Sequence, residues 1–177
     1  MPTITGSADR TRTPQVGDER ETLLSMLAFQ RDTIRWKCSG LSSEQLAQRH
    51  APSALTLGGL LKHLAVVEAG WVNLTFAGGV EAPSWLDQWQ RENEGWTFTT
   101  AAADSPAQLF AWLDESQRVT EQIVASAAGL DVLAVNPPEG EGPYSLRWIL
   151  LHLVQEYARH LGHADLIREA IDGSVGV

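Results

Sequence analysis

The stretch that decides the fold is SLRWILLHLVQEYARHLGHADLIREAIDG, residues 145–173. On a helix that turns about 100° per residue, its apolar residues gather within about 60° of His160. Ser145 is a residue type that caps helices, and Gly173 lies just beyond the predicted helix end near Ala170. We therefore predict one long amphipathic helix with His160 at the centre of its buried face. The apolar residues of that face are Leu146, Ile149, Leu153, Tyr157, Ala164, Ile167 and Ile171.

Three further segments repeat apolar residues at helical spacing. The first covers about residues 18–37, and the second begins at the capping residue Thr56 and ends near Gly78. The third begins at Ser105, a cap followed by a proline, and ends near Gly129. No segment shows the alternating pattern of a strand. We predict an all-α fold, one four-helix bundle over residues 17–173, with a flexible N-terminal arm (1–16) and a C-terminal tail (174–177).

A long connection, about residues 77–105, joins the second and third predicted helices. Such a length is uncommon unless the segment crosses the bundle or lines a site, and it suits helices that are not simple hairpin neighbours. The connection contains Trp85, Trp89 and Trp96, three of the seven tryptophans in the chain. We expect tryptophans to fill the core, or some of them to wall a pocket for an organic ligand. Because these three give much apolar surface, we also predict a homodimer.

Composition excludes several classes of function. A net charge of −9 argues against non-specific binding to nucleic acid or to anionic lipid. No apolar run approaches the length of a membrane span, and the first residues lack the apolar core of a secretion signal. The single cysteine, Cys38, rules out an intramolecular disulfide and a paired-cysteine metal site. We therefore expect a cytoplasmic protein without a nucleic-acid or membrane partner.

The candidate site begins with Glu156, which lies one turn before His160 and about 40° away from it on the same helix. A carboxylate this close to a buried face is costly unless it is paired, protonated or bound to a cation. On the second helix, His63 flanks the apolar stripe. Two histidines and one glutamate form a ligand set typical of catalytic zinc with an open coordination position. We predict a divalent metal, zinc, held by His63, Glu156 and His160.

Other interpretations of these residues stay open. Glu156 could instead pair with Arg31, which falls on the inner face of the first helix. His152 could contact Glu156 without binding the metal itself. His163 could likewise contact a ligand residue, or it could be a ligand in place of one of the three. Cys38 lies on a buried stripe without an activating partner, which favours packing over a nucleophilic role.

Two sequence stretches carry a family resemblance: LGGLLKHLAVVEAGW at 57–71, which contains His63, and EYARHLGHADLIREAIDG at 156–173. They resemble the DinB-like four-helix-bundle superfamily, in the branch of mycothiol-dependent maleylpyruvate isomerase and the mycothiol transferases. That family has one histidine on the second helix and, on the fourth, an acidic residue or histidine followed four residues later by histidine. The pattern matches His63, Glu156 and His160, and the resemblance covers roughly residues 19–173.

The resemblance implies a metal-dependent thiol S-transferase, in which mycothiol is the low-molecular-weight thiol and attacks a small electrophile. Arg159 and Arg168 could then meet carboxylates of a polar cosubstrate. Two alternatives remain: a metal-dependent hydrolase that uses metal-bound water, and a non-catalytic metal-binding stress or interaction protein.

Overall fold

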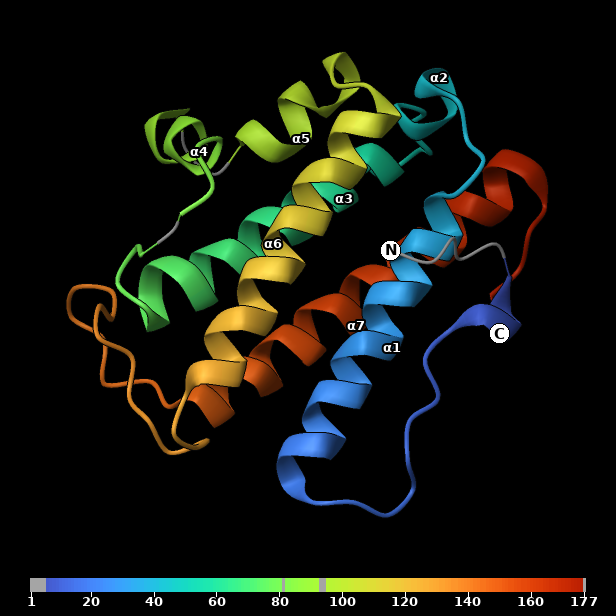
Figure 1. Ribbon diagram of the computed structural model, residues 1–177. Coiled ribbons are helices and arrows are strands. Elements are labelled where there is room, and N and C mark those ends of the chain that lie inside the picture. Colours follow the sequence, from blue (N-terminus) through green and yellow to red (C-terminus); the bar gives the residue numbers. More distant parts are fainter. Residues whose placement is uncertain (1–5, 81, 93–94, 177) are drawn as a thin grey trace.

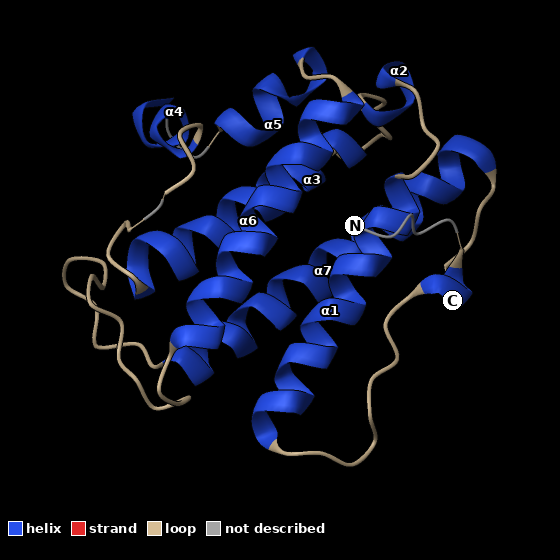
Figure 2. Cartoon of the chain, in the orientation of Figure 1, coloured by secondary structure: helices blue, strands red, loops and turns tan. Residues whose placement is uncertain are grey.

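The computed structural model describes residues 6–80, 82–92 and 95–176. Within these ranges the regular elements are helices (Figure 2), apart from one isolated bridge between Leu133 and Ser145. Four long elements form the bundle: α1 (Glu19–Cys38), α3 (Leu57–Glu68) with its π-helical continuation η2 (Ala69–Phe76), α6 (Pro106–Ser126) and α7 (Leu146–Asp172). The predicted all-α four-helix bundle is confirmed.

The bundle consists of two pairs of parallel helices. α1 packs mainly against α7, and α3 packs against both α6 and α7. Figure 1 shows that α3 and α6 run side by side in the same direction, and that α1 and α7 run opposite to them. The chain must therefore return from the end of η2 to the start of α6, which explains the long second connection. As predicted, the second and third bundle helices are not a hairpin.

The long connection carries helices of its own. It contains α4 (Leu86–Glu92), α5 (Trp96–Thr100) and the 3₁₀ turn η3 (Ala101–Ala103). α5 and η3 pack onto α3. Two further short elements precede α3: the 3₁₀ turn η1 (Ser7–Asp9) and α2 (Ser43–Leu46). The sequence does not predict the helices of the connection, because these are too short to show a periodic pattern.

Side-chain caps set the beginnings of the long helices. The side chains of Asp18, Thr56, Ser105 and Ser145 each accept a hydrogen bond from the backbone N–H three residues later. At the other end of α7, Gly173 has φ 80°, a left-handed conformation that a side chain disfavours. The three caps predicted from sequence, at residues 56, 105 and 145, are therefore confirmed.

The inward face of α7 follows its predicted pattern. His160 is buried, and so are six of the seven apolar residues named for this face, while Ile171 at the end of the helix is half-buried. Leu27 and Ile34 of α1 meet this face in the same core cluster. The periodicity of the sequence thus places His160 correctly at the inside of the bundle.

Arg31 does not pair with Glu156, contrary to the open alternative. Its guanidinium bonds to Glu68 at the end of α3, and also to Glu121 of α6 at 3.1 Å. Glu68 is 0% exposed and also accepts a hydrogen bond from Tyr157. The inner face of α1 reaches α3 at this level, so a different carboxylate neutralises Arg31. Glu156 is left for another partner.

The tryptophans of the connection do not form an exposed apolar surface. Trp85 and Trp96 are 9% and 2% exposed, and Trp89 is half-buried. The indole N–H of Trp85 donates to Glu115, and the ammonium group of Lys62 lies 3.8 Å from the Trp96 ring centroid. These contacts remove the reason given for a homodimer, which stays a prediction without that support.

The described part of the N-terminal arm lies along α1. The Arg10 guanidinium stacks over the rings of Phe29 and Trp36, and Thr11 bonds to Asp32 through both its N–H and its hydroxyl. The arm that was expected to be flexible therefore has specific contacts with the bundle. Among the helices of the described ranges, none has the length and apolarity that a membrane span requires.

Candidate metal centre

His63, Glu156 and His160 converge at the contact between α3 and α7. Each offers one ligand atom, and these three atoms lie within 4.8 Å of one another. Glu156 Oε2 is 3.7 Å from His63 Nε2 and 3.5 Å from His160 Nε2. The two imidazole ring centroids are 4.6 Å apart. The structure thus brings together the three residues that the sequence selects.

The separations suit a tetrahedral ion. Zinc ligands lie at about 2.0–2.2 Å from the metal, so two nitrogen or oxygen ligands of a tetrahedral site are about 3.3–3.6 Å apart. The carboxylate-to-imidazole distances are close to this spacing. In addition, His63 Nε2 is buried and has no hydrogen-bond partner. A buried polar atom without a partner is costly, and a cation between it and Glu156 would remove that cost.

Both imidazoles are in the form that binds metals. Burial lowers the pKa of His63, although the neighbouring Glu156 carboxylate opposes the shift. Burial also lowers the pKa of His160 to about 4, and the adjacent His63 contributes in the same direction. Because each pKa falls below its usual value, both rings are neutral at pH 7 and present a lone pair.

Neighbouring rings hold the two histidines in place. Phe98 of α5 stacks on His63 with a centroid distance of 5.2 Å. On the other side, His163 Nδ1 lies 3.4 Å from His160 Nδ1, so His163 contacts the ring nitrogen that faces away from Glu156. This is the position of a residue that orients a ligand.

His152 has a different environment from the one expected. Its ring stacks on Trp148 at 5.0 Å and meets Trp71 edge-on at 4.8 Å. Burial lowers its pKa, and the charge of Glu156 works against that shift. His152 therefore belongs to an aromatic cluster one turn from Glu156, together with Trp71, Trp148 and Tyr144.

The two arginines named as candidate cosubstrate contacts differ from each other. Arg159 is exposed, and its charge contributes to the lowered pKa of both His63 and His160. Arg168 instead bonds to Asp172 and to the backbone carbonyls of residues 37 and 39 at the end of α1. Its guanidinium thus serves the contact between α1 and α7.

A comparison with known protein families identifies the family of this chain. The family model described as mycothiol-S-transferase matches residues 22–173. The chain belongs to the mycothiol-S-transferase family. The matched region includes all four bundle helices and the three converging residues, although α1 is matched only from its fourth residue. A search of curated proteins found no match.

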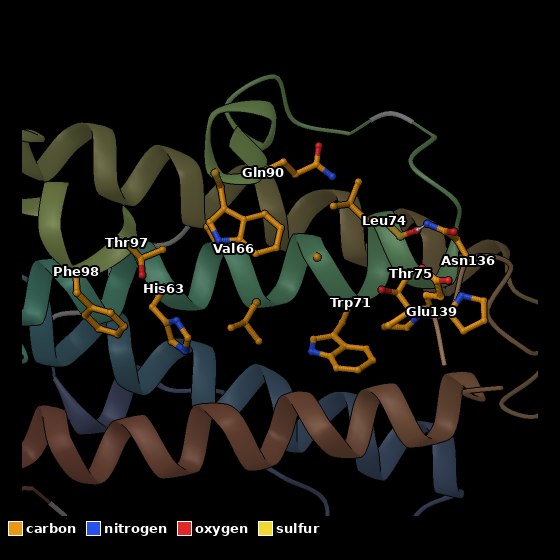
Figure 3. A pocket seen from close by; sticks show the side chains of 15 residues that line it. His63, Val66, Trp71, Leu74, Thr75, Gln90, Thr97, Phe98, Asn136 and Glu139 are labelled. Carbon is orange, nitrogen blue, oxygen red and sulfur yellow. Dashed lines mark hydrogen bonds between the residues drawn. The ribbon is translucent and has the colours of Figure 1, made fainter. Parts of the chain in front are cut away.

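In this member of the mycothiol-S-transferase family, a groove of about 1030 Å³ begins at His63. It runs along α3 and η2, past Gly70 and Trp71, to Leu74 and Thr75. In Figure 3, His63 and Trp71 point from these helices toward α7. Trp89 and Gln90 of α4 and Thr97 and Phe98 of α5 line one side, and residues 136–139 close the far end. The pocket-wall role considered for the tryptophans is therefore confirmed for Trp71 and Trp89.

Several residues of this site were missed by sequence reasoning. Phe98 and Thr97 lie in the connection, where no periodicity indicates which side chain faces α3. We recognised no sequence pattern that predicts the π-helical form of η2. The prolines and glycine near residues 136–140 indicate an irregular loop, but its place beside η2 depends on backbone hydrogen bonds to Thr75 and Phe76.

Proposed function

We propose that this protein transfers the sulfur of mycothiol to a small electrophile, using a divalent metal of the zinc type bound by His63, Glu156 and His160. The observation that carries the proposal is the buried, unpartnered His63 Nε2. It faces a carboxylate oxygen at 3.7 Å, which in turn lies 3.5 Å from the second imidazole, in a chain of the mycothiol-S-transferase family.

The chemistry requires a thiolate at neutral pH. Thiols titrate near about 8.5 in water, and a coordinating dication removes the proton. Glu156 would supply the one negative charge of the ligand set, so that a dication with this carboxylate and one thiolate is formally neutral. Such neutrality suits a half-buried position, because an unbalanced charge is costly there.

The residues around the ligands would keep the geometry fixed. Phe98 restricts the His63 ring, and His163 contacts the far side of His160. Of the two arginines considered as cosubstrate contacts, Arg159 is the one whose charge lowers the pKa of His63 and His160. We propose that Arg159 attracts an acidic group of a cosubstrate. Cys38 is not part of this chemistry, because burial raises the pKa of its thiol to about 12.

A hydrolytic alternative has less support from the arrangement. A metal-bound water would need a base beside it, and His152 and His163 were the candidates. His152 stacks on Trp148 and meets Trp71 edge-on, while His163 faces the far nitrogen of His160.

The test combines metal analysis with turnover. Protein purified without a metal-affinity step should contain about one divalent ion per chain and should accelerate the reaction of mycothiol with 1-chloro-2,4-dinitrobenzene. His63→Ala and His160→Ala should lose both properties, whereas His50→Ala, a change in an exposed loop, should keep them. In the cobalt-substituted protein, mycothiol should add a sulfur-to-metal absorption band. Full activity in metal-free protein, or ester hydrolysis without thiol transfer, would refute the proposal.

A further inference from the structure

The groove that starts at His63 has a distinctive chemical character. From residue 63 to residue 75 it extends on the order of 15–18 Å along the helix axis. Part of its wall is apolar and includes Val67, Trp71, Trp89 and Phe98. Among the described residues that line it there is no lysine or arginine, and Glu139 at the far end is a carboxylate. An anionic ligand would therefore be repelled there rather than neutralised.

Gly70 lines the groove, and no side chain enters the groove at this position. A Cβ placed on Gly70 would meet no atom within 4 Å. Gly70 lies within η2, in the interior of a helical stretch where glycine costs about 1 kcal/mol relative to alanine. The contacts around Gly70 do not explain that cost. Space for a bound molecule at this position of the groove would explain it.

At the metal end of the groove, a second buried polar group besides His63 Nε2 has no hydrogen-bond partner. Thr97 lines the groove and is 1% exposed, yet its hydroxyl forms no hydrogen bond. The next residue, Phe98, stacks on the ligand His63, so Thr97 lies close to the position where a nucleophile would be held. An unsatisfied buried hydroxyl is costly, and a ligand oxygen in the groove would satisfy it.

We propose that this groove binds the electrophile, and that the electrophile is an uncharged, elongated and mainly apolar molecule with an oxygen atom beside its reacting carbon. The inference rests on the proposed function, because the thiolate must be delivered at the His63 end. Mycothiol is itself a less suitable occupant of the apolar part of the groove. Its sugar hydroxyls would lose hydrogen bonds to water against the walls formed by Val67, Trp71, Trp89 and Phe98.

A terminal epoxide has the required chemistry. The mycothiol thiolate forms a carbon–sulfur bond with the terminal epoxide carbon, and the carbon–oxygen bond at that carbon breaks. The electron pair of the broken bond stays on oxygen. The oxygen accepts a hydrogen bond from Thr97 as its charge develops, and then takes a proton from water. The product is a β-hydroxy thioether, and no other reactant is needed.

The experiment compares four epoxides with the metal-loaded protein and mycothiol: 1,2-epoxybutane, 1,2-epoxyoctane, and two eight-carbon epoxides that end in an amide or a carboxylate. Four additional methylenes are worth about two-hundredfold if fully buried. An open groove that buries about half of them should raise kcat/KM at least about tenfold for 1,2-epoxyoctane over 1,2-epoxybutane. The carboxylate should react several-fold more slowly than the amide, because the apolar walls and Glu139 both disfavour a negative charge, and Glu139→Gln should reduce that difference.

Two glycine variants form a matched pair. Gly70→Leu fills the floor of the groove and should abolish the preference for the longer epoxide. Gly162, like Gly70, is helical and has open space around an added Cβ, but it is exposed and lies outside the groove, so Gly162→Leu should keep the preference. Metal content measured on both variants reports whether the site is intact.

The hydroxyl of Thr97 is tested by the isosteric change Thr97→Val. This variant should retain the metal and the fold, because it removes an unsatisfied polar group. Its kcat for epoxide opening should fall about tenfold, the order contributed by a hydrogen bond to developing charge.

The outcomes separate the two proposals. Thiol transfer that is independent of chain length, or a preference for the carboxylate, would overturn the groove inference while the proposed function stands. The groove inference also fails if Gly70→Leu raises KM for mycothiol and leaves the epoxide preference unchanged, since the groove would then hold the thiol. Absence of metal and of turnover with every epoxide would overturn both.

Discussion

The hydroxyl of Tyr157 donates a hydrogen bond of 2.7 Å to Glu68 Oε2 in the centre of the bundle. Tyr157 follows the metal-ligand candidate Glu156 on α7, and Glu68 is the last residue of α3, five positions after His63. Arg31 of α1 neutralises Glu68, and Gln117 of α6 donates to the Tyr157 hydroxyl at 3.3 Å. All four bundle helices are thus joined by one buried polar network directly behind the candidate metal centre.

This network predicts a specific loss of stability for Tyr157→Phe. Burial raises the pKa of Tyr157 well above its usual value, and the Glu68 charge adds to the shift, so the phenol stays protonated and donates. Removal of the hydroxyl leaves a fully buried carboxylate with one donor fewer. We expect a decrease of about 1–3 kcal/mol in the free energy of unfolding, measured by denaturant titration.

Arg31→Met provides the comparison, because it removes the charge partner instead of a neutral donor. It should cost more than Tyr157→Phe, about 3–5 kcal/mol, since Glu68 would remain buried and unpaired. A smaller loss for Arg31→Met than for Tyr157→Phe would contradict the description of Glu68 as an ion-paired carboxylate.

Substitution of Glu156 separates its ligand role from a structural one. Since Arg31 pairs with Glu68, Glu156 is not needed to neutralise a buried arginine, and both Glu156→Gln and Glu156→His should fold. Glu156→Gln removes the negative charge and should weaken zinc binding, whereas Glu156→His keeps a good ligand and should retain the ion. Metal stoichiometry and thermal midpoint are measured side by side. Full metal retention by Glu156→Gln would exclude the carboxylate as a ligand.

Much of the fold follows from local signals in the sequence. Thr56, Ser105 and Ser145 satisfy backbone donors within their own first turns, so the starts of three helices depend on nothing distant. The inward direction of His160 follows from the period of α7. For the same reason, the convergence of His63, Glu156 and His160 could be predicted before the helix contact was known.

Features that depend on contacts between distant segments were not predictable in the same way. The partner of Arg31 is Glu68, thirty-seven residues away along the chain. Glu68 follows Leu64 by one helical turn, so its place near the apolar stripe could have marked it as buried. Nothing local shows that Trp96 lies against Lys62, or that Gly70 faces a groove. The homodimer prediction lost its supporting argument for the same reason, because the contacts that bury Trp85 and Trp96 are not local.

Cys38 should be unreactive in the folded protein. It is 1% exposed, and burial raises the pKa of its thiol to about 12, above the usual value, so the thiolate is scarce at pH 8. Ellman's reagent should find no thiol in the native protein and one per chain after unfolding in guanidinium chloride. Rapid native labelling would mean that α1 and α7 separate at this end, and it would also interfere with thiol-transfer assays.

Removal of the metal should lower the stability of the bundle without unfolding it. The core of α1, α3, α6 and α7 is packed independently of the site, which lies at its edge with Glu156 partly exposed. An ion that binds only the native state adds stability in proportion to the logarithm of its concentration over its Kd, about 4 kcal/mol at a thousandfold excess. Chelator-treated protein should therefore remain helical by circular dichroism, melt at a lower temperature, and recover its melting temperature when zinc is added.

The control for this prediction is His63→Ala, which should melt at the same temperature with and without zinc. His50→Ala should respond to zinc as the unmodified protein does, because its imidazole lies in an exposed loop. A zinc-dependent rise in the melting temperature of His63→Ala would place the stabilising ion elsewhere. Complete unfolding on chelation would instead mean that the ion is required for the fold, which the independent packing of the core argues against.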